Sequence, residues 1–423
     1  MRRFSWLMCV SATILVAGLG SPTWAQNHGG RGTVVIPASS IEHPEDIGVR
    51  SHTNFRIFVP SEGPAAMQNK GAKPQSAGPP FPGYFFETPA SMACVYGFVG
   101  QTPGCDPNIV TTNPSGGSRA IAIVDAFDYP EAASDLAYFS NQFGLPPANF
   151  TVVYAKGVEP PTDPSGGWEI EEALDIEWAH AMAPNAKIYL VEAASNYNFD
   201  LYSALGVAAQ LVSKSGGGEI SMSWGSGEFT GETAYDSHFS KTSGIVYFAA
   251  SGDGPGVIYP SASPYVVAAG GTSTSRNSST GAFQASVAWQ SGGGGLSAVE
   301  SRPSYQDSVA STVGPWRGTP DLSFNADPET PVWVFTTFFG PGLWYVVGGT
   351  SVASPSLAGV VNAAGNFAAS STAELNTIYG NLGNSGFFTD IASGSCGVYE
   401  GNLSVAGYDN CTGAGVPNGY SGK

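Results

Sequence analysis

Short apolar runs alternate with helix-length stretches along most of the chain, and this alternation constrains the fold more than any other feature. The apolar runs are nearly continuous and rich in β-branched residues, which is typical of strands buried on both faces. Such a pattern predicts a parallel sheet covered by helices on both sides, an α/β fold. The predicted strands are 120–127, 150–155, 187–193, 219–225, 245–253 and 265–271, and the predicted helices are 129–143, 168–182 and 199–214.

A further apolar strand, residues 344–349, ends directly before Thr350 and Ser351. Functional sites in such folds form at the carboxyl ends of strands. A serine at a strand-to-helix turn also lies near a helix N-terminus, which stabilises developing negative charge. The sequence therefore predicts that Ser351 is a nucleophile, provided that another group takes its proton.

No histidine is an obvious base for this serine. His28, His43 and His52 lie in a loop-like N-terminal region, and His180 and His238 lie in helical patterns. None stands in the His-Gly-Thr-His context of subtilisin-type enzymes.

Carboxylates offer a different base. Glu171 and Asp175 are four residues apart in an acidic predicted helix, and therefore share one face. Burial of this pair would raise a carboxyl pKa, and such a pair accepts a serine proton best in acid. The alternative is a solvated acidic face, the commoner meaning of charge runs on helices. Apolar neighbours such as Leu174 and Ile176 favour partial burial.

Asp253 follows the apolar strand 245–253 in a glycine turn. One interpretation is ordinary turn chemistry, since Asp and Gly are both common in turns. The other is a protonated carboxyl that donates a hydrogen bond to an oxyanion, which also requires low pH.

Taken in order, these motifs resemble the sedolisins, the serine-carboxyl peptidases with a subtilisin-like fold. The resemblance covers roughly residues 92–420 and implies a three-layer αβα architecture with a mostly parallel sheet. The matching motifs are Glu171-x-x-x-Asp175, Ser221-x-Ser223-Trp224-Gly225, Ser251-Gly252-Asp253-Gly254, Tyr259-Pro260, Gly270-Gly271-Thr272, Pro303-x-Tyr305-Gln306, Pro320-Asp321-Leu322-Ser323 and Gly349-Thr350-Ser351-x-x-x-Pro355.

The resemblance assigns a role to each site residue. Ser351 matches the nucleophile, Glu171 the general base, Asp175 the acid that orients it, and Asp253 the oxyanion-hole donor. The segment Ser223, Trp224 and Gly225 matches the strand that pairs with substrate backbone. Asp125 matches an acid linked to the Glu–Asp pair, although it could instead cap the turn at Asp128–Glu131.

The resemblance also implies one structural calcium ion near the C-terminus. It assigns carboxylate ligands to Asp390 and Asp409, and backbone carbonyl ligands to Ile391, Val405 and Gly407. Hard oxygen donors of this kind suit Ca²⁺. Without the resemblance, two acids in loops would be unremarkable.

The first 25 residues read as a secretory signal peptide. Arg2 and Arg3 precede an apolar run at 6–18 that is short for a membrane span, and Thr23-Trp24-Ala25 is a plausible cleavage site. We therefore expect export to the periplasm or the extracellular space, with no membrane attachment after signal removal. The alternative is a retained anchor.

Residues 26–91 form a Gly/Pro-rich segment before the predicted peptidase domain, 92–423. The stretch 71–83 reads as linker. The segment is shorter than the folded prosegment typical of the family and looks too loop-rich to form one. It is a candidate propeptide that could act as a short inhibitor or stay as an extension.

Four cysteines remain after signal removal, an even number that suggests disulfides in an exported chain. Three pairings exist, and we favour the local ones, Cys94–Cys105 and Cys396–Cys411. Lys plus Arg total 16 against 33 Asp plus Glu, a net charge of −17. This charge disfavours nucleic-acid and anionic-membrane partners.

The sequence thus predicts a secreted, acid-acting serine-type peptidase, endopeptidase or tripeptidyl-type, that acts on proteins or peptides, and we expect a monomer. One rival is a catalytically silent, calcium-stabilised extracellular binding protein on the same fold. Another is an esterase. A neutral subtilisin-like protease is disfavoured because the histidine motif is absent.

Overall fold

The structure is a computed structural model that describes residues 26–28, 32–61, 79–81, 83–100, 102–340, 342–397 and 402–423. The predicted signal peptide and most of the predicted linker lie outside the described residues. Among the described residues no helix has the length and apolar character needed to cross a membrane.

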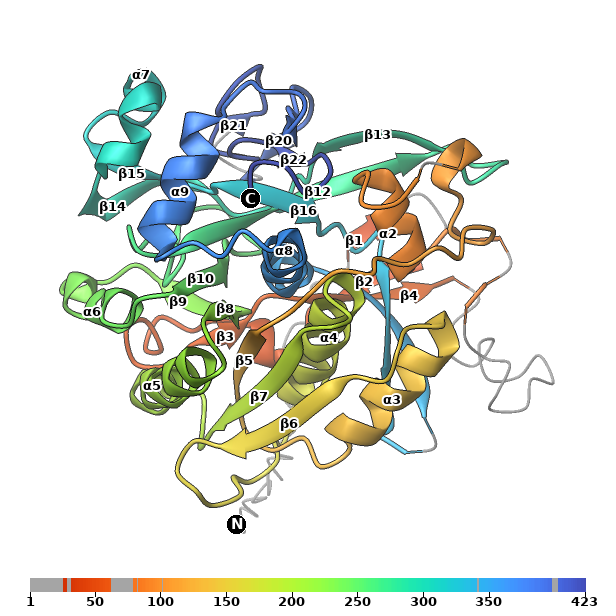
Figure 1. Cartoon of the computed structure of the whole chain (residues 1–423), viewed down its shortest axis with the longest axis horizontal. Helices are drawn as coiled ribbons and strands as arrows, with labels where there is room; N and C mark the ends of the chain where they lie inside the picture. Colours follow the sequence, from red (N-terminus) through yellow and green to blue (C-terminus); the bar gives the residue numbers. More distant parts are fainter. Residues whose placement is uncertain are drawn as a thin grey trace, which may run out of the picture.

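An eight-stranded sheet forms the centre of the molecule (Figure 1). Its strand order is β13-β12-β10-β8-β5-β7-β6, with β16 also paired to β12. All pairings are parallel except β12 with β13, which confirms the predicted, mostly parallel sheet. The strands are β5 Ala120–Ala126, β6 Asn149–Tyr154, β7 Lys187–Ala193, β8 Gly218–Met222, β10 Ile245–Ala250, β12 Val267–Arg276, β13 Phe283–Ala288 and β16 Leu322–Asn325.

Helices cover both faces of this sheet, because alternate residues of its strands point to opposite sides. In β5, Ile121 and Ile123 pack in one hydrophobic core while Ala122 and Val124 pack in the other. The first core holds α3 (Ala132–Phe143), α4 (Gly167–Met182) and α8 (Thr350–Ala364), and the second holds α5 (Asn198–Lys214). The three-layer αβα architecture is therefore as predicted.

A second sheet has the order β1-β2-β4-β18-β17, and it differs from expectation in two ways. The strand before Ser351, β18 (Leu343–Gly348), pairs antiparallel with β17 (Val332–Thr336) and β4 (Arg56–Pro60), outside the parallel sheet. The N-terminal region, predicted to be loop-rich, also supplies β1 (Gln26–His28) and β2 (Gly32–Val35).

The loop-rich prediction for the N-terminal region was wrong because its average composition hid two strand-forming stretches. Gly32–Val35 and Arg56–Pro60 contain β-branched and aromatic residues that pair antiparallel with each other. The predicted boundary between residues 91 and 92 falls inside α2 (Pro89–Val95), so the N-terminal region continues directly into the domain.

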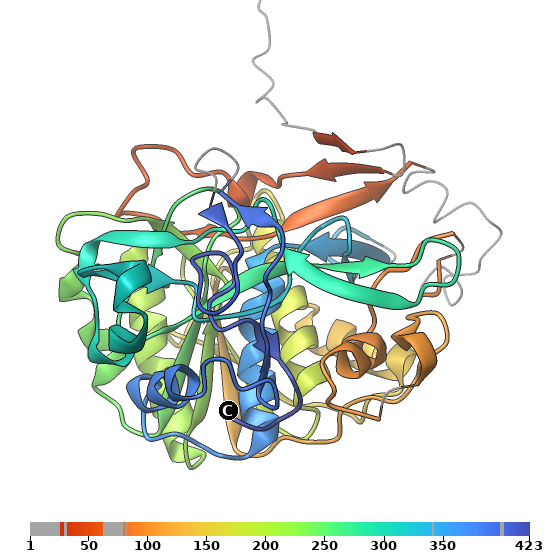
Figure 2. The same ribbon diagram turned by 90° about the horizontal axis from the view of Figure 1, so that it is seen from above.

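The remaining elements are short and lie mostly at the periphery; Figure 2 shows the N-terminal strands running across one side of the body. They are η1 Ala38–Ser40, β3 His52–Thr53, η3 Pro103–Cys105, β9 Trp224–Gly227, η4 Glu232–Ala234, α6 Ser237–Ser240, β11 Ile258–Tyr259, β14 Gly295–Ser301, η5 Ser304–Val309, α7 Ala310–Val313, β15 Trp316–Thr319, α9 Ser371–Gly380, β19 Phe388–Thr389, β20 Ser395–Cys396, β21 Asn402–Leu403 and β22 Val416–Pro417.

Both favoured disulfides are confirmed. Cys94 bonds to Cys105 and Cys396 bonds to Cys411, with sequence separations of 11 and 15 residues. Closing loops of this length stabilises a fold by about 3 kcal/mol each, mainly by restricting the unfolded chain.

A fully buried ion pair, Arg317 with Asp321, lies beside β12. Asp321 accepts hydrogen bonds from both terminal nitrogens of Arg317, at 2.7 and 2.5 Å, and from the Tyr379 hydroxyl at 2.8 Å. Neither charged side chain reaches solvent. Removing one charge from such a pair leaves the other buried and uncompensated.

We expect Asp321→Asn to lower the free energy of unfolding by about 3–5 kcal/mol, since it strands the Arg317 charge. Asp307→Asn is the matched control, because Asp307 pairs with Arg302 but is 63% exposed; it should cost less than about 1 kcal/mol. Urea denaturation of both variants measures the difference. Equal effects would contradict this account of the buried pair.

Candidate active site

The structure places Ser351 at the first turn of α8, directly after β18, as predicted. The turn depends on Gly349, which has a φ of 123° and precedes the helix. A Cβ at Gly349 would collide with the backbone carbonyl of Asn54 and lie 2.6 Å from Oδ2 of Asp253. The glycine therefore lets these groups gather around the N-terminus of α8, where Ser351 is fully buried.

Helix α4 brings Glu171 and Asp175 to this serine. The helix packs closely along α8, since a Cβ on Gly359 of α8 would lie only 2.7 Å from Cβ of Met182 of α4. Both acids are completely buried, so the solvated-face interpretation is wrong. Oδ1 of Asp175 accepts a 2.8 Å hydrogen bond from the Ser223 hydroxyl, which also donates to the Ser351 carbonyl at 3.3 Å.

Both oxygens of the Glu171 carboxyl are buried and have no hydrogen-bond partner of good geometry. Burial raises its pKa well above the ordinary value, and the Asp125 and Asp253 carboxyls raise it further. The Ser351 hydroxyl lowers that pKa, which places the hydroxyl beside the carboxyl. Glu171 is thus a desolvated carboxyl next to the serine, and it could exchange a proton with the serine hydroxyl.

Asp125 lies at the end of β5 and belongs to the same acid group. Burial raises its pKa to about 8, and both of its oxygens lack hydrogen-bond partners. Its charge is the largest electrostatic influence on the pKa of both Glu171 and Asp175. The alternative role as a cap for the turn after β5 is therefore wrong.

Asp253 follows β10 and contacts Thr350, the residue before Ser351. Its Oδ1 accepts hydrogen bonds from the Thr350 backbone N–H at 2.7 Å and the Thr350 hydroxyl at 2.9 Å. Its Oδ2 is buried without a partner. Burial raises its pKa to about 6, opposed by the charge of Arg56. Below that pH a protonated Oδ2 is available to donate a hydrogen bond.

The predicted substrate-pairing segment meets the chain's own N-terminal region. The Ser223 carbonyl accepts hydrogen bonds from the Ser351 hydroxyl and from the Asn54 backbone N–H, both at 3.2 Å. Trp224 is anchored from behind by an indole hydrogen bond to the Val124 carbonyl at 2.7 Å. Strand β9 pairs antiparallel with β3, so Gly225 lies opposite His52.

Sequence reasoning missed this part of the site. Asn54 and Arg56 contact Ser351 and Asp253, and the guanidinium of Arg56 donates to the Asp253 backbone carbonyl. The available signal was the strand-forming stretch at 55–59. Together the two segments line a hollow of about 220 Å³ that includes His52, Gly225 and Asp253.

Histidine does not act as a hydrogen-bond partner of Ser351 in the described part of the chain, although His52 lines the hollow beside it. The His180 ring bonds to the Pro146 carbonyl at 2.9 Å, and burial lowers the pKa of His180. His52 pairs with Asp46 at 3.2 Å. Among the described side chains, none of the histidines contacts Ser351 through a hydrogen bond.

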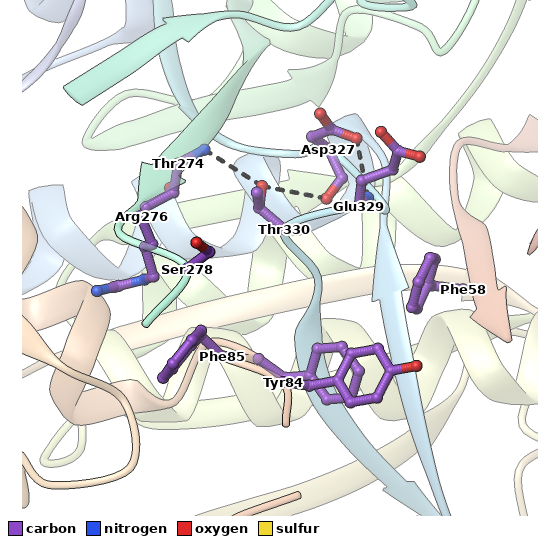
Figure 3. A pocket seen from close by; sticks show the side chains of 10 residues that line it. Phe58, Tyr84, Phe85, Thr274, Arg276, Ser278, Asp327, Glu329 and Thr330 are labelled. Atoms are coloured by element: carbon purple, nitrogen blue, oxygen red, sulfur yellow. Dashed lines mark hydrogen bonds between the residues drawn. The ribbon is translucent and has the colours of Figure 1, made fainter. Parts of the chain in front are cut away.

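A separate pocket of about 530 Å³ lies away from these acids, where Phe58, Tyr84 and Phe85 face Thr274 and Thr330 (Figure 3). The Thr274 N–H donates to the Thr330 hydroxyl at 3.2 Å across its wall. No catalytic candidate lines this pocket, so it has no assigned part in the chemistry.

The predicted calcium ligands gather around one C-terminal loop. The Gly407 N–H donates to Oδ2 of Asp390 at 2.8 Å, and the Ser404 hydroxyl bridges the Ile391 carbonyl and Asp409. These hydrogen bonds tie Asp390, Ile391 and Asp409 to the same loop, and their oxygens are of the kind that a hard cation prefers. The described residues contain no group of three acidic, His or Cys side chains that could hold a metal, so backbone carbonyls would have to complete the site.

Comparison with known proteins agrees with the sequence resemblance. No family model matches the chain. It is 28% identical to kumamolisin of Bacillus sp. (strain MN-32) over 92% of this chain and 71% of that protein. It is 26% identical to sedolisin of Pseudomonas sp. (strain 101), over 62% of this chain and 49% of that protein, about half its length. These matches confirm the resemblance to the sedolisins.

A solved structure of Pseudomonas sedolisin, described as a serine-carboxyl proteinase, superposes with a TM-score of 0.64 at 22% identity. The match covers 79% of this chain and 95% of that one. At this identity it shows the shared α/β fold.

The buried acids predict a protein that is most stable in acid. Their folded pKa values, about 6 for Asp253 and about 8 for Asp125 and Glu169, exceed ordinary values near 4. Between the ordinary pKa and the raised pKa of each group, the folded chain therefore binds more protons than the unfolded chain. Its free energy of unfolding should fall as pH rises from 4 to 8, by up to about 1.4 kcal/mol per pH unit for each such group.

Melting curves between pH 3 and pH 8 measure this slope. Glu172→Gln should flatten it, because Glu172 is fully buried without hydrogen bonds. Glu159→Gln, at an exposed position of the chain, is the control. A melting temperature that peaks at neutral pH would rule out the expected linkage.

Proposed function

We propose that this chain is a serine-carboxyl peptidase of the sedolisin type, exported from the cell, that cleaves peptide bonds in acid. The observation that carries the proposal is the buried arrangement of Ser351 between Glu171 on α4 and Asp253 after β10. Protein or peptide substrates would enter along β9 and Ser223, the residue before it, whose carbonyl accepts a backbone N–H in this structure.

In the first step the Ser351 oxygen bonds to the substrate carbonyl carbon, and its proton passes to Glu171. The oxyanion accepts hydrogen bonds from the Ser351 backbone N–H and from protonated Asp253. Glu171 then returns the proton to the leaving nitrogen as the C–N bond breaks. Water attacks the acyl-enzyme by the reverse proton route, and Ser351 regains its hydrogen.

The remaining acids are positioning residues. The negative charge of Asp125 raises the pKa of Glu171 and of Asp175, which helps the group to hold a proton. The Ser223 hydroxyl donates a hydrogen bond that orients Asp175. Asp253 must hold a proton to donate to the oxyanion, and its pKa is about 6, so we expect activity below that pH.

Nothing described favours the silent binding-protein alternative, because all four predicted catalytic side chains are present and completely or almost completely buried near the start of α8. The signal-like N-terminus supports export. The net charge of −17 argues against nucleic acid as a partner.

We expect Ser351→Ala and Glu171→Gln each to reduce cleavage of denatured haemoglobin at pH 3–5 by at least 10³-fold, since they remove the nucleophile and the base. Glu172→Gln is the matched control: it is the next residue on α4, equally buried, and should keep activity. Cleavage rates from pH 2 to pH 8, after incubation of the full chain in acid, give the result. Activity that survives in Glu171→Gln would exclude this residue as the base.

We also propose that one structural Ca²⁺ binds at Asp390, Asp409 and the carbonyls of Ile391, Val405 and Gly407. The support is that the Gly407 N–H and the Ser404 hydroxyl link Asp390, Ile391 and Asp409 to one loop tied by the Cys396–Cys411 disulfide. The bound ion would neutralise the two carboxylates and hold the loop; it would not enter the reaction.

Binding at about 100 times the dissociation constant would add about 2.7 kcal/mol to stability, so EDTA should lower the melting temperature by several degrees. Asp390→Asn should melt at the lower temperature with or without calcium, whereas Asp307→Asn should keep the calcium response. Identical melting curves of the parent chain in EDTA and in calcium would refute the site.

A further inference from the structure

Strand β17 is the last strand in the described part of the second sheet, and a single bridge to Glu87 is the strand-like pairing found on its outer edge. On its other edge it pairs with β18, in a register that places Trp333 opposite Val346. Strand β18 runs directly into the turn that carries Ser351. The outer edge needs further partners, because a buried backbone N–H or C=O without one destabilises a fold.

Side chains of helix α4 supply partners along this outer edge. The Phe335 N–H donates a 3.1 Å hydrogen bond to Oε2 of Glu177. The indole N–H of Trp178 donates a 3.0 Å hydrogen bond to the Trp333 carbonyl. Both side chains are completely buried, so water has no access to replace either hydrogen bond. The helix therefore takes the place that a sixth strand would have in this five-stranded sheet.

The tip of the β17–β18 hairpin also rests on α4, at the start of the helix. Gly166 precedes α4 with a φ of 69°, and a Cβ at this position would collide with the ring of Phe339. Helix α3 fixes the same tip, since Oδ2 of Asp135 accepts the Thr337 N–H at 2.7 Å. The contacts with the hairpin thus extend from Gly166 to Trp178, over about three turns of α4.

The two acids that α4 supplies to the active site lie within this stretch, but on another side of the helix. Glu177 follows Asp175 by two residues, which is about 200° around a helix of 3.6 residues per turn. Glu171 lies beside the Ser351 hydroxyl of α8, whereas Glu177 contacts β17. Helix α4 is therefore held between the helix that carries the nucleophile and the hairpin that leads into it.

We propose that Glu177 and Trp178 are positioning residues, which keep the acid-bearing helix α4 in register with the hairpin that leads to Ser351. This inference rests on the proposed peptidase function. The hydrogen bonds of both residues go to the hairpin backbone and not to the reacting atoms, so each acts through the separation of Glu171 and Ser351. A displacement of about 1 Å between reacting groups can lower a rate about 100-fold, so a small shift of α4 would be visible in turnover.

Trp178→Phe tests the indole contact against a matched control. The change removes the N–H that holds the Trp333 carbonyl and keeps an aromatic ring in its place. Trp344→Phe is the control, because Trp344 of β18 is 7% exposed and its indole nitrogen has no hydrogen-bond partner among the described residues. We expect Trp178→Phe to lower kcat for denatured haemoglobin at pH 4 about 10-fold, with KM unchanged within about twofold. Trp344→Phe should lower kcat less than about threefold.

Glu177 is tested by two substitutions at the same position. Burial raises the pKa of Glu177 well above its ordinary value, so its carboxyl is neutral in acid. Glu177→Gln keeps a neutral oxygen that can accept the Phe335 N–H, and it should keep kcat within about threefold of the parent chain. Glu177→Leu removes the acceptor and should lower kcat at least about 10-fold.

Two further readouts separate positioning from a general loss of stability. Rates are expressed per folded molecule and measured well below the melting temperature of each variant, where a merely structural role predicts the parent kcat. Positioning predicts that the loss of kcat persists there and is the same across the active pH range, because no charge near Ser351 is changed. If Glu177→Leu does not fold, the comparison of Trp178→Phe with Trp344→Phe decides.

The outcomes distinguish this inference from the proposed function. If the parent chain cleaves haemoglobin and folded Trp178→Phe and Glu177→Leu keep its kcat, the positioning inference fails and the peptidase function stands. Equal losses in Trp178→Phe and Trp344→Phe, or a rise in KM alone, would also overturn it. If the parent chain cleaves nothing at any pH, the peptidase function fails and this inference fails with it.

Discussion

The burial of several carboxyls between α4, α8 and β5 is the constraint on which the rest of the site depends. Desolvation alone would make ionised Glu171, Asp175 and Asp125 very costly, so the group must keep protons. In the proposed reaction, a group that holds some protons but keeps Glu171 ionised could take the serine proton and return it, as histidine does elsewhere. The same burial makes the stability of the fold depend on pH.

Much of this site could be predicted from the sequence because its residues lie in short, regular contexts. Ser351 follows an apolar strand, and Glu171 and Asp175 share a helix face, so local periodicity placed both correctly. Burial of the acids could not be decided locally, since it depends on how closely α8 packs against α4. The C-terminal donors are likewise brought together by contacts between distant loops, and their metal remains a prediction.

The main error of the sequence-based prediction concerned the N-terminal segment, which was expected to be loop-rich, and it has a physical reason. Strand β3 has only two residues and exists because it pairs with β9, about 170 positions later. No local propensity marks such a strand, and the Gly and Pro residues that follow it dominated the composition. The partner strand, rather than the segment itself, determines the conformation of Asn54.

Strand β4 has one more consequence. It lies between β2 and β18, so it belongs to the sheet that leads into α8 even though it precedes the predicted domain start at residue 92. A chain shortened to that start would leave β18 with unpaired N–H and C=O groups along one side, close to Ser351. Such an edge readily recruits another strand, so the shortened protein would tend to self-associate through the very surface that should accept substrate.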